Sequence, residues 1–279
     1  MEKKEERQEV SAGMKVCRVI GVVLVLAASF TASAQEYLRG DVNNDGHVDV
    51  CDVTCLISYI LTDSWPDEQI VPDNHEYVDL GLPSGTLWAT CNLGASSPEE
   101  FGDYFAWGET TPKETYNWMT YKWGSGNELD GWQYRELTKY CSDSTYGLYG
   151  FHDNLTELLP EDDAATANWG NGWRTPTRAQ WRELVSYTFP PQATFQNNVK
   201  GFTLKSANGN SIFLPITGKY MKSGFIENSA EYWSSTKDYS HPKEFYANSF
   251  MMVPEYDWEV CEWDERYIGN PIRPVRSAN

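Results

Sequence analysis

Residues 175–187 read Thr-Pro-Thr-Arg-Ala-Gln-Trp-Arg-Glu-Leu-Val-Ser-Tyr and predict the main helix of the chain. Thr177 can cap its first turn, and Gln180, three residues later, completes a capping box. Three apolar residues then recur at helical spacing and predict the inner face: Trp181, Leu184 and Val185. This segment is the best helix prediction in the sequence.

Short strands are predicted on both sides of this helix. Residues 202–205 and 211–214 flank Asn208-Gly209, which is a strong signal for a β-hairpin turn. Further strands are predicted at 85–91, 231–235, 245–252, 258–263 and 272–275. Residues 98–140 lack periodicity, and we expect long loops packed by aromatic side chains there. One main helix among short antiparallel strands predicts an α+β fold.

Several motifs of the C-terminal part follow one another in a recognisable order. They are Tyr77-Val-Asp-Leu-Gly-Leu-Pro-Ser-Gly-Thr-Leu-Trp-Ala-Thr-Cys-Asn-Leu-Gly-Ala95, Phe101-Gly-Asp-Tyr-Phe-Ala-Trp-Gly-Glu109, Asn168-Trp-Gly-Asn-Gly-Trp-Arg-Thr-Pro-Thr177, Tyr232-Trp-Ser-Ser-Thr236 and Ile272-Arg-Pro-Val-Arg276. This part resembles the Fibrobacter succinogenes major paralogous domain, a family of exported bacterial domains. The resemblance implies a C-type-lectin-like fold in its formylglycine-generating-enzyme variant, but it implies no definite activity.

Residues 41–52 carry oxygen ligands at alternate positions, as a calcium loop of the EF-hand kind requires. Calcium takes roughly six to eight oxygens, so alternate side chains must converge on it. Gly46 permits the sharp turn, and His47 would ligate through its backbone carbonyl. The predicted metal ligands are Asp41, Asn43, Asp45, His47, Asp49 and Asp52. Apolar residues at helical spacing predict an exit helix from Val50 to Leu61.

The segment from Gly40 to Leu61 resembles a dockerin repeat, which closes its loop with aspartate and needs no entering helix. Dockerins of the cellulosome kind carry two repeats, and a pair of loop residues, often Ser-Thr, contacts the cohesin. Here we find one repeat, and the corresponding pair is Val50-Cys51. The resemblance implies calcium binding, but this pair makes a cohesin-like partner doubtful. The half-module could instead pair with another copy, pack on the large domain or act as a calcium-set spacer.

The N-terminal residues are typical of a secretory signal peptide. Lys15 and Arg18 precede an apolar run at 19–28, Ala32-Ser33-Ala34 offers a cleavage site, and the true start could be Met14. The predicted organisation is a signal peptide at 1–34, a dockerin-like half-module at 35–65, a linker at 66–76 and a lectin-like domain at 77–279. We therefore expect an exported protein, at the cell surface, secreted or periplasmic, without a transmembrane segment in the mature chain.

The net charge of −18 argues against nucleic acid and anionic membranes as partners. Within this acidic sequence, Glu161, Asp162 and Asp163 have two interpretations. They hold a second cation, or they stand at the N-terminus of a short helix, where the helix dipole favours negative charge. Cysteines outside the signal peptide show neither an even count nor zinc-ligand spacing, so we expect most to be small buried apolar residues.

The last strands and loops are rich in aromatic and amide side chains, which give rigid contact area and adaptable hydrogen bonds. Sugars stack on the faces of such rings. The predicted ligand-binding residues are Tyr232, Trp233, Tyr246, Asn248, Trp258 and Trp263. The alternative is that these side chains fill the core of a domain that has few aliphatic residues.

No catalytic pattern stands out in the sequence. A formylglycine-generating oxidase needs a nearby cysteine pair, and the last third of the chain holds only Cys261. We therefore expect a calcium-binding protein that is not an enzyme and that recognises a glycan or protein ligand. The alternative is a structural or assembly role, with docking through the dockerin-like helix. A third possibility is an accessory or enzyme of polysaccharide degradation, which would need two facing carboxylates.

Overall fold

The computed structural model describes residues 75–125, 135–170, 172–226, 229–241, 243–253 and 259–278, together with Val53 and Leu56. The chain divides into two units between Asp73 and Asn74. Val53 and Leu56 are helical, and both fall within the predicted exit helix. The predicted signal peptide and the calcium loop lie outside the described residues. Within the described ranges, every helix is too short or too polar to cross a lipid bilayer.

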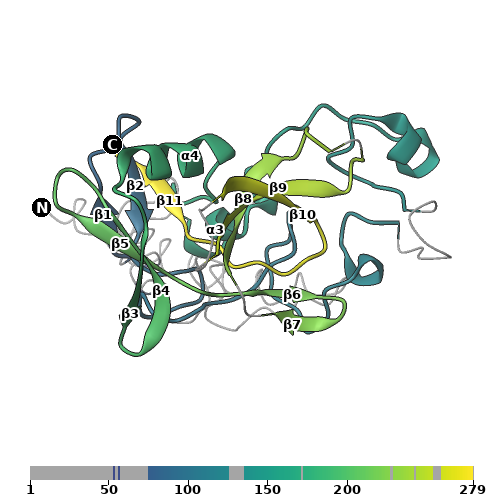
Figure 1. The fold of residues 1–279 in the computed structure, drawn as a ribbon. Coiled ribbons are helices and arrows are strands. Elements are labelled where there is room, and N and C mark those ends of the chain that lie inside the picture. Colours follow the sequence, from purple (N-terminus) through teal and green to yellow (C-terminus); the bar gives the residue numbers. More distant parts are fainter. Residues whose placement is uncertain are drawn as a thin grey trace, which may run out of the picture. The chain divides into compact units, whose positions relative to one another are not determined.

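The described part of the second unit is a mixed α+β fold of small antiparallel sheets with few helices (Figure 1). One sheet has the order β1-β2-β11, with bounds Tyr77–Asp79, Thr86–Ala89 and Val275–Ser277. Another has the order β3-β4-β5, with bounds Gln192–Gln196, Val199–Lys205 and Ser211–Pro215. The third has the order β10-β9-β8, with bounds Glu259–Glu265, Tyr246–Met252 and Ala230–Lys237. A hairpin joins β6 (Lys219–Met221) to β7 (Gly224–Ile226).

Two α-helices and several 3₁₀ turns complete the described elements. The α-helices are α3 (Ala164–Trp169) and α4 (Arg178–Tyr187). The 3₁₀ turns are η1 (Trp118–Thr120), η3 (Ser144–Tyr146), η4 (Leu148–Gly150) and η5 (Pro160–Asp162). Between β2 and α3 the described chain consists of these turns, loops and isolated bridges, which confirms the loop prediction for this region.

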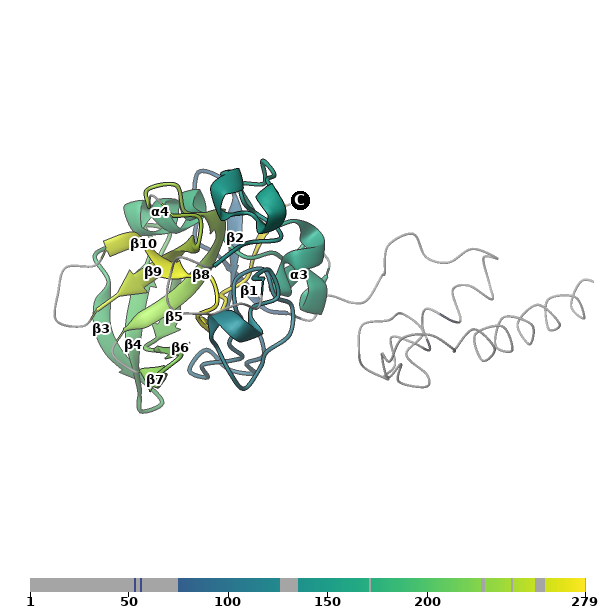
Figure 2. The same cartoon turned by 90° about the vertical axis from the view of Figure 1, so that its right-hand side faces the viewer.

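Helix α4 confirms the main helix prediction in position and in its capping. The Thr177 hydroxyl accepts a hydrogen bond from the Gln180 backbone N–H at 3.2 Å, and the Gln180 side chain accepts one from the Thr177 N–H at 3.0 Å. The helix packs on the sheet β10-β9-β8 (Figure 1 and Figure 2). The ring of Trp181 stacks on Phe250 of β9, with centroids 4.2 Å apart. The apolar face predicted from spacing is therefore the face that meets the sheet.

The predicted hairpin is β4-β5, with Phe202 opposite Leu214. Gly209 in its turn has φ +94°, which a residue without a side chain adopts at little cost. The adjacent Asn208 amide donates to the Asp79 carbonyl at 3.0 Å, so the turn is tied to β1. The strands β3, β6 and β7 were not predicted. Most side chains of these three short strands are partly or fully exposed, so they lack the buried apolar alternation that marks a strand.

The last strand begins later than the sequence predicts. Residues 272–274 precede β11, which pairs with β2 from Val275 onward. Pro274 has no backbone N–H to donate to a ladder. Arg273 is fully buried, and its guanidinium donates to the carbonyls of Thr90 and Phe213 at 2.7 and 3.1 Å. The carbonyls of Pro274 and Ile272 still accept hydrogen bonds from the Ala89 and Leu93 N–H groups, both at 2.9 Å, so this stretch lies against the chain around β2 without forming a regular ladder.

Candidate functional site

The predicted calcium loop, residues 41–52, lies outside the described part of the chain. Its fit to a metal therefore rests on the chemistry of the donors. Asp41, Asn43, Asp45, Asp49 and Asp52 supply carboxylate or amide oxygens, and His47 supplies a backbone carbonyl. Hard oxygen donors at these spacings suit calcium.

Two of the three acidic residues before α3, Asp162 and Asp163, bind to protein groups, whereas the Glu161 side chain is 65% exposed. Asp163 caps the helix by accepting from the Ala165 N–H at 2.9 Å, and it also accepts from the Thr175 N–H and hydroxyl at 2.9 and 2.8 Å. Asp162 is buried and pairs with Lys139 at 2.5 Å. Carboxylates that are already neutralised and hydrogen-bonded have little capacity left for a second cation. Within the described ranges, no group of three or more potential metal-binding side chains occurs.

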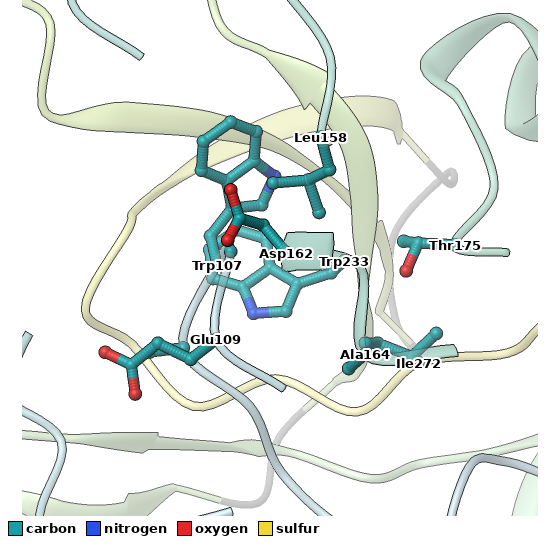
Figure 3. A pocket seen from close by; sticks show the side chains of 10 residues that line it. Trp107, Glu109, Leu158, Asp162, Ala164, Thr175, Trp233 and Ile272 are labelled. Atoms are coloured by element: carbon teal, nitrogen blue, oxygen red, sulfur yellow. The ribbon is translucent and has the colours of Figure 1, made fainter. Parts of the chain in front are cut away.

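A small hollow lies beside this acidic run (Figure 3). Its lining includes the indole rings of Trp107 and Trp233 and the side chains of Glu109 and Asp162. Glu109 accepts from the Lys113 ammonium and the Lys122 backbone N–H, both at 2.8 Å. The hollow has room for about one water molecule. It is therefore too small to be the sugar site that its aromatic and acidic lining would otherwise suggest.

Four of the six predicted ligand residues belong to the core. Tyr232, Trp233, Tyr246 and Asn248 are at most 5% exposed. Trp233 donates its indole N–H to the Phe105 carbonyl at 2.6 Å, and the Tyr232 hydroxyl donates to the Pro215 carbonyl at 3.0 Å. The interpretation of these four side chains as an accessible ligand face is therefore wrong. They fill the interior of the domain, as the alternative interpretation of these side chains as core residues predicts.

The physical reason is that β8 is covered on both faces. Successive side chains of a strand point to opposite faces. Tyr232 faces α4, with its ring 5.6 Å from Trp181, while Trp233 packs into the other core cluster with Phe105 and Phe245. A strand that is buried on both faces carries large apolar residues without alternation. In the sequence alone, such a run of aromatic residues cannot be told from an aromatic binding surface.

Trp263 is the predicted ligand residue that the structure leaves exposed. It lies on β10 and is 43% exposed. Its ring meets Tyr246 at 4.8 Å and His241 at 4.7 Å, and the His241 ring lies 3.9 Å from Tyr246. We call these three residues the Trp263 cluster. Trp258 lies outside the described residues. His241 was not among the predicted ligand residues, because no spacing in the sequence links it to Trp263.

Comparison with known proteins gives a match in the N-terminal part of the chain. Residues 39–81 match the model of the dockerin type I domain. Dockerin type I domains bind calcium through EF-hand-like loops, so calcium is the cofactor of this chain. They bind cohesin partners, and dockerin proteins are typically extracellular or at the cell surface. No curated protein and no solved structure matches the chain.

The matched segment extends beyond the single repeat predicted from sequence. It reaches Gly81, and its last residues include β1. There Tyr77 pairs with Ala89 and Asp79 with Leu87, so the described end of the match is a strand of the second unit. The predicted calcium donors at 41–52 lie inside the matched segment.

Proposed function

We propose that this chain is an exported assembly protein that docks a cohesin-type partner through a calcium-set dockerin module and displays its C-terminal domain. The observation that carries the proposal is the dockerin match at 39–81, which encloses the predicted calcium donors. We assign the module to residues 35–65, the linker to 66–76 and the displayed domain to 77–279, after a signal peptide at 1–34. In this role the protein needs no catalytic activity of its own.

The direct ligands follow from the loop positions. We assign Asp41, Asn43, Asp45 and Asp49 as side-chain ligands and Asp52 as the closing carboxylate, with His47 acting through its carbonyl. Calcium supplies the charge that holds these acidic residues together and so sets the start of the exit helix. Without the metal, the clustered carboxylates repel one another, and we expect the docking surface to lose its shape.

Calcium titration of the full chain by calorimetry tests the ligand assignment. Asp45→Ala removes a central ligand, and we expect it to weaken calcium binding at least tenfold. The matched control is Asp67→Ala, which removes one aspartate from the linker and should leave the affinity unchanged. Unchanged calcium affinity in Asp45→Ala would contradict the assignment.

A second measurement separates docking from calcium binding. Val50 occupies one of the two loop positions that contact the partner in dockerins of the cellulosome kind, and it is not a calcium ligand. We expect Val50→Asp to abolish capture by immobilised cohesins while calcium affinity stays within about twofold. Chelation of calcium should abolish capture of the unaltered chain. Capture that survives both treatments would overturn the docking role.

We further propose that the displayed domain is a lectin-like member of the major paralogous domain family. The ordered motifs from Tyr77 to Arg276 support this proposal, and the mixed fold of small antiparallel sheets is compatible with it. A binding role for this domain is the second candidate function. It rests on the exposed Trp263 and its contacts with His241 and Tyr246.

Glycan-array screening tests the second candidate. A sugar ring stacked on an exposed indole contributes about 1–2 kcal/mol, comparable to other contacts made at aromatic faces. We expect Trp263→Ala to lose any glycan signal and Trp263→Phe to keep part of it. Equal signals from the native chain and Trp263→Ala would remove the basis for a glycan site at this position.

A further inference from the structure

A lysine joins three strands that are distant in sequence. The Lys219 ammonium on β6 lies 2.7 Å from the Glu231 Oε2 on β8 and 2.8 Å from the Asp264 Oδ1 on β10. The side chains of Lys219, Glu231 and Asp264 are 17%, 3% and 9% exposed. We call these residues the Lys219 triad. Water therefore has little access to the point where an amine meets two carboxyl groups.

Neutral donors hold the remaining carboxyl oxygens. The Ser229 hydroxyl donates to the Glu231 Oε1 at 2.5 Å, and the Asn270 amide donates to the Asp264 Oδ2 at 3.0 Å. Asn270 is fully buried. Each carboxyl group thus has one oxygen toward Lys219 and the other toward a neutral donor. This arrangement fixes the orientation of both groups relative to the amine.

The two carboxyl groups have different roles. Lys219 donates a hydrogen bond to Asp264, whereas its contact with Glu231 is an ion pair. Burial, together with the nearby charge of Asp264, raises the pKa of Glu231. One ammonium carries a single positive charge and cannot neutralise two buried carboxylates. Glu231 is the carboxyl group that this environment favours in its neutral, acidic form.

We propose that Lys219 and Asp264 condense to an intramolecular isopeptide bond, with Glu231 as the neighbouring acid that relays protons. The Lys219 ammonium first gives a proton to Asp264. The freed Nζ lone pair attacks the Asp264 Cγ, and Glu231 donates a proton to the oxygen that leaves. Glu231 recovers a proton from the nitrogen. One C–N bond forms, one C–O bond breaks and one water molecule departs, so the step needs no oxidant or co-reactant.

The fold supplies the driving force for this condensation. In water, amide formation from a free amine and a free carboxylate is opposed by the loss of translational and rotational freedom of the two reactants and by the excess of water, which favours hydrolysis. Groups held in contact reach effective molarities of about 10⁵–10⁸ M, which offsets that opposition. The Asn270 N–H is placed to stabilise negative charge on the Asp264 oxygen as the carbon becomes tetrahedral. The product would tie β6 to β10 covalently without any cysteine.

Mass spectrometry of the full chain tests the proposal. We expect the purified protein to be lighter than its sequence by one water molecule. Trypsin should yield residues 206–222 linked to residues 244–266, because an acylated Lys219 is not cleaved. Loss of ammonia in place of water would assign the acyl group to Asn270 and overturn the role of Asp264. A full mass with free peptide 206–219 would overturn the bond itself.

Variants separate the roles of the three residues. Lys219→Arg keeps the positive charge but has no primary amine, so we expect it to retain its full mass. Glu231→Gln keeps the size of the side chain and removes the acid, and we expect at least tenfold slower bond formation. The mass of the unaltered chain decides the proposal even if a variant fails to fold. Complete bond formation in Glu231→Gln would contradict the proton relay.

Discussion

At the residue scale, buried charges join loops that carry little regular structure. Lys237 is 1% exposed, yet its ammonium reaches the Ser142 hydroxyl at 2.8 Å and forms an ion pair with Glu244. The Ser142 hydroxyl in turn donates to Glu244 at 2.7 Å. This three-residue contact links the end of β8 to two separate loops. Its strength depends on the charge of one carboxylate, which makes it sensitive to acid.

The first prediction concerns Glu244. Burial raises the pKa of its carboxyl group. The hydrogen bonds from Lys237 and Ser142, together with the positive charge of Lys237, outweigh burial, so the net pKa is lowered. A lowered carboxyl pKa contributes stability above the unfolded value of about 4.3, and this contribution is lost as the pH falls through the folded value. We expect Glu244→Gln to lose about 1.5–3 kcal/mol at neutral pH. Its stability should also fall less steeply in acid.

Urea unfolding between about pH 3 and pH 7 measures both effects. The matched control is Glu161→Gln, because Glu161 is 65% exposed and lies 3.7 Å from its lysine partner. Exposed pairs of this kind contribute about 0–1 kcal/mol. The assignment fails if the two variants lose the same stability or show the same dependence on pH.

At the scale of elements, local sequence signals predicted α4 correctly. The side chains of β8 were misinterpreted as a ligand-binding face, because β8 is buried on both faces. The capping box of α4 involves residues three apart, so it is visible in the sequence. The burial of β8 depends on α4 on one side and on the loop around Phe105 on the other. Those partners lie far from β8 in sequence. The sequence pattern of these aromatic residues therefore predicted a ligand-binding surface, whereas their packing places them in the core.

The second prediction tests the start of α4. Thr177→Ala removes the side chain that accepts from the Gln180 N–H, and the loss of such a cap costs about 1 kcal/mol. Ser186→Ala is the control on the same helix, because the Ser186 hydroxyl only donates to the Arg182 carbonyl at an exposed site. We expect this control to change the free energy of unfolding by less than about 0.5 kcal/mol. Equal losses in urea unfolding would rule out a special role for the cap.

At the scale of the whole second unit, its two ends meet in one sheet. The central strand β2 pairs with β1 from the start of the unit and with β11 from its end. Trp88 on β2 and Val275 on β11 are opposite one another, and both are fully buried. Val275, close to the end of the second unit, is therefore part of its core.

The third prediction follows from this closure. Deletion of residues 275–279 removes β11, and the buried Val275 side chain alone contributes about 1.5–3 kcal/mol. Lost ladder hydrogen bonds add about 1 kcal/mol each. We expect a large drop in the urea midpoint, followed by tryptophan fluorescence. Deletion of only Ala278 and Asn279 keeps the strand and should cost about 1 kcal/mol. A midpoint unaffected by the longer deletion would show that β11 does not close the unit.

The sequence by itself determined the features that rest on neighbouring residues. These are the capped helix α4, the β4-β5 hairpin with its Asn208-Gly209 turn and the mixed α+β class. The calcium donors at 41–52 stay a prediction, inside a segment that matches the dockerin type I domain. Tertiary structure decided which aromatic side chains are core and which are exposed. It also brought Lys219, Glu231 and Asp264 together from three strands. Helix caps and turns depend on contacts over a few residues, whereas burial and charge clusters depend on chain segments that meet only when the protein folds.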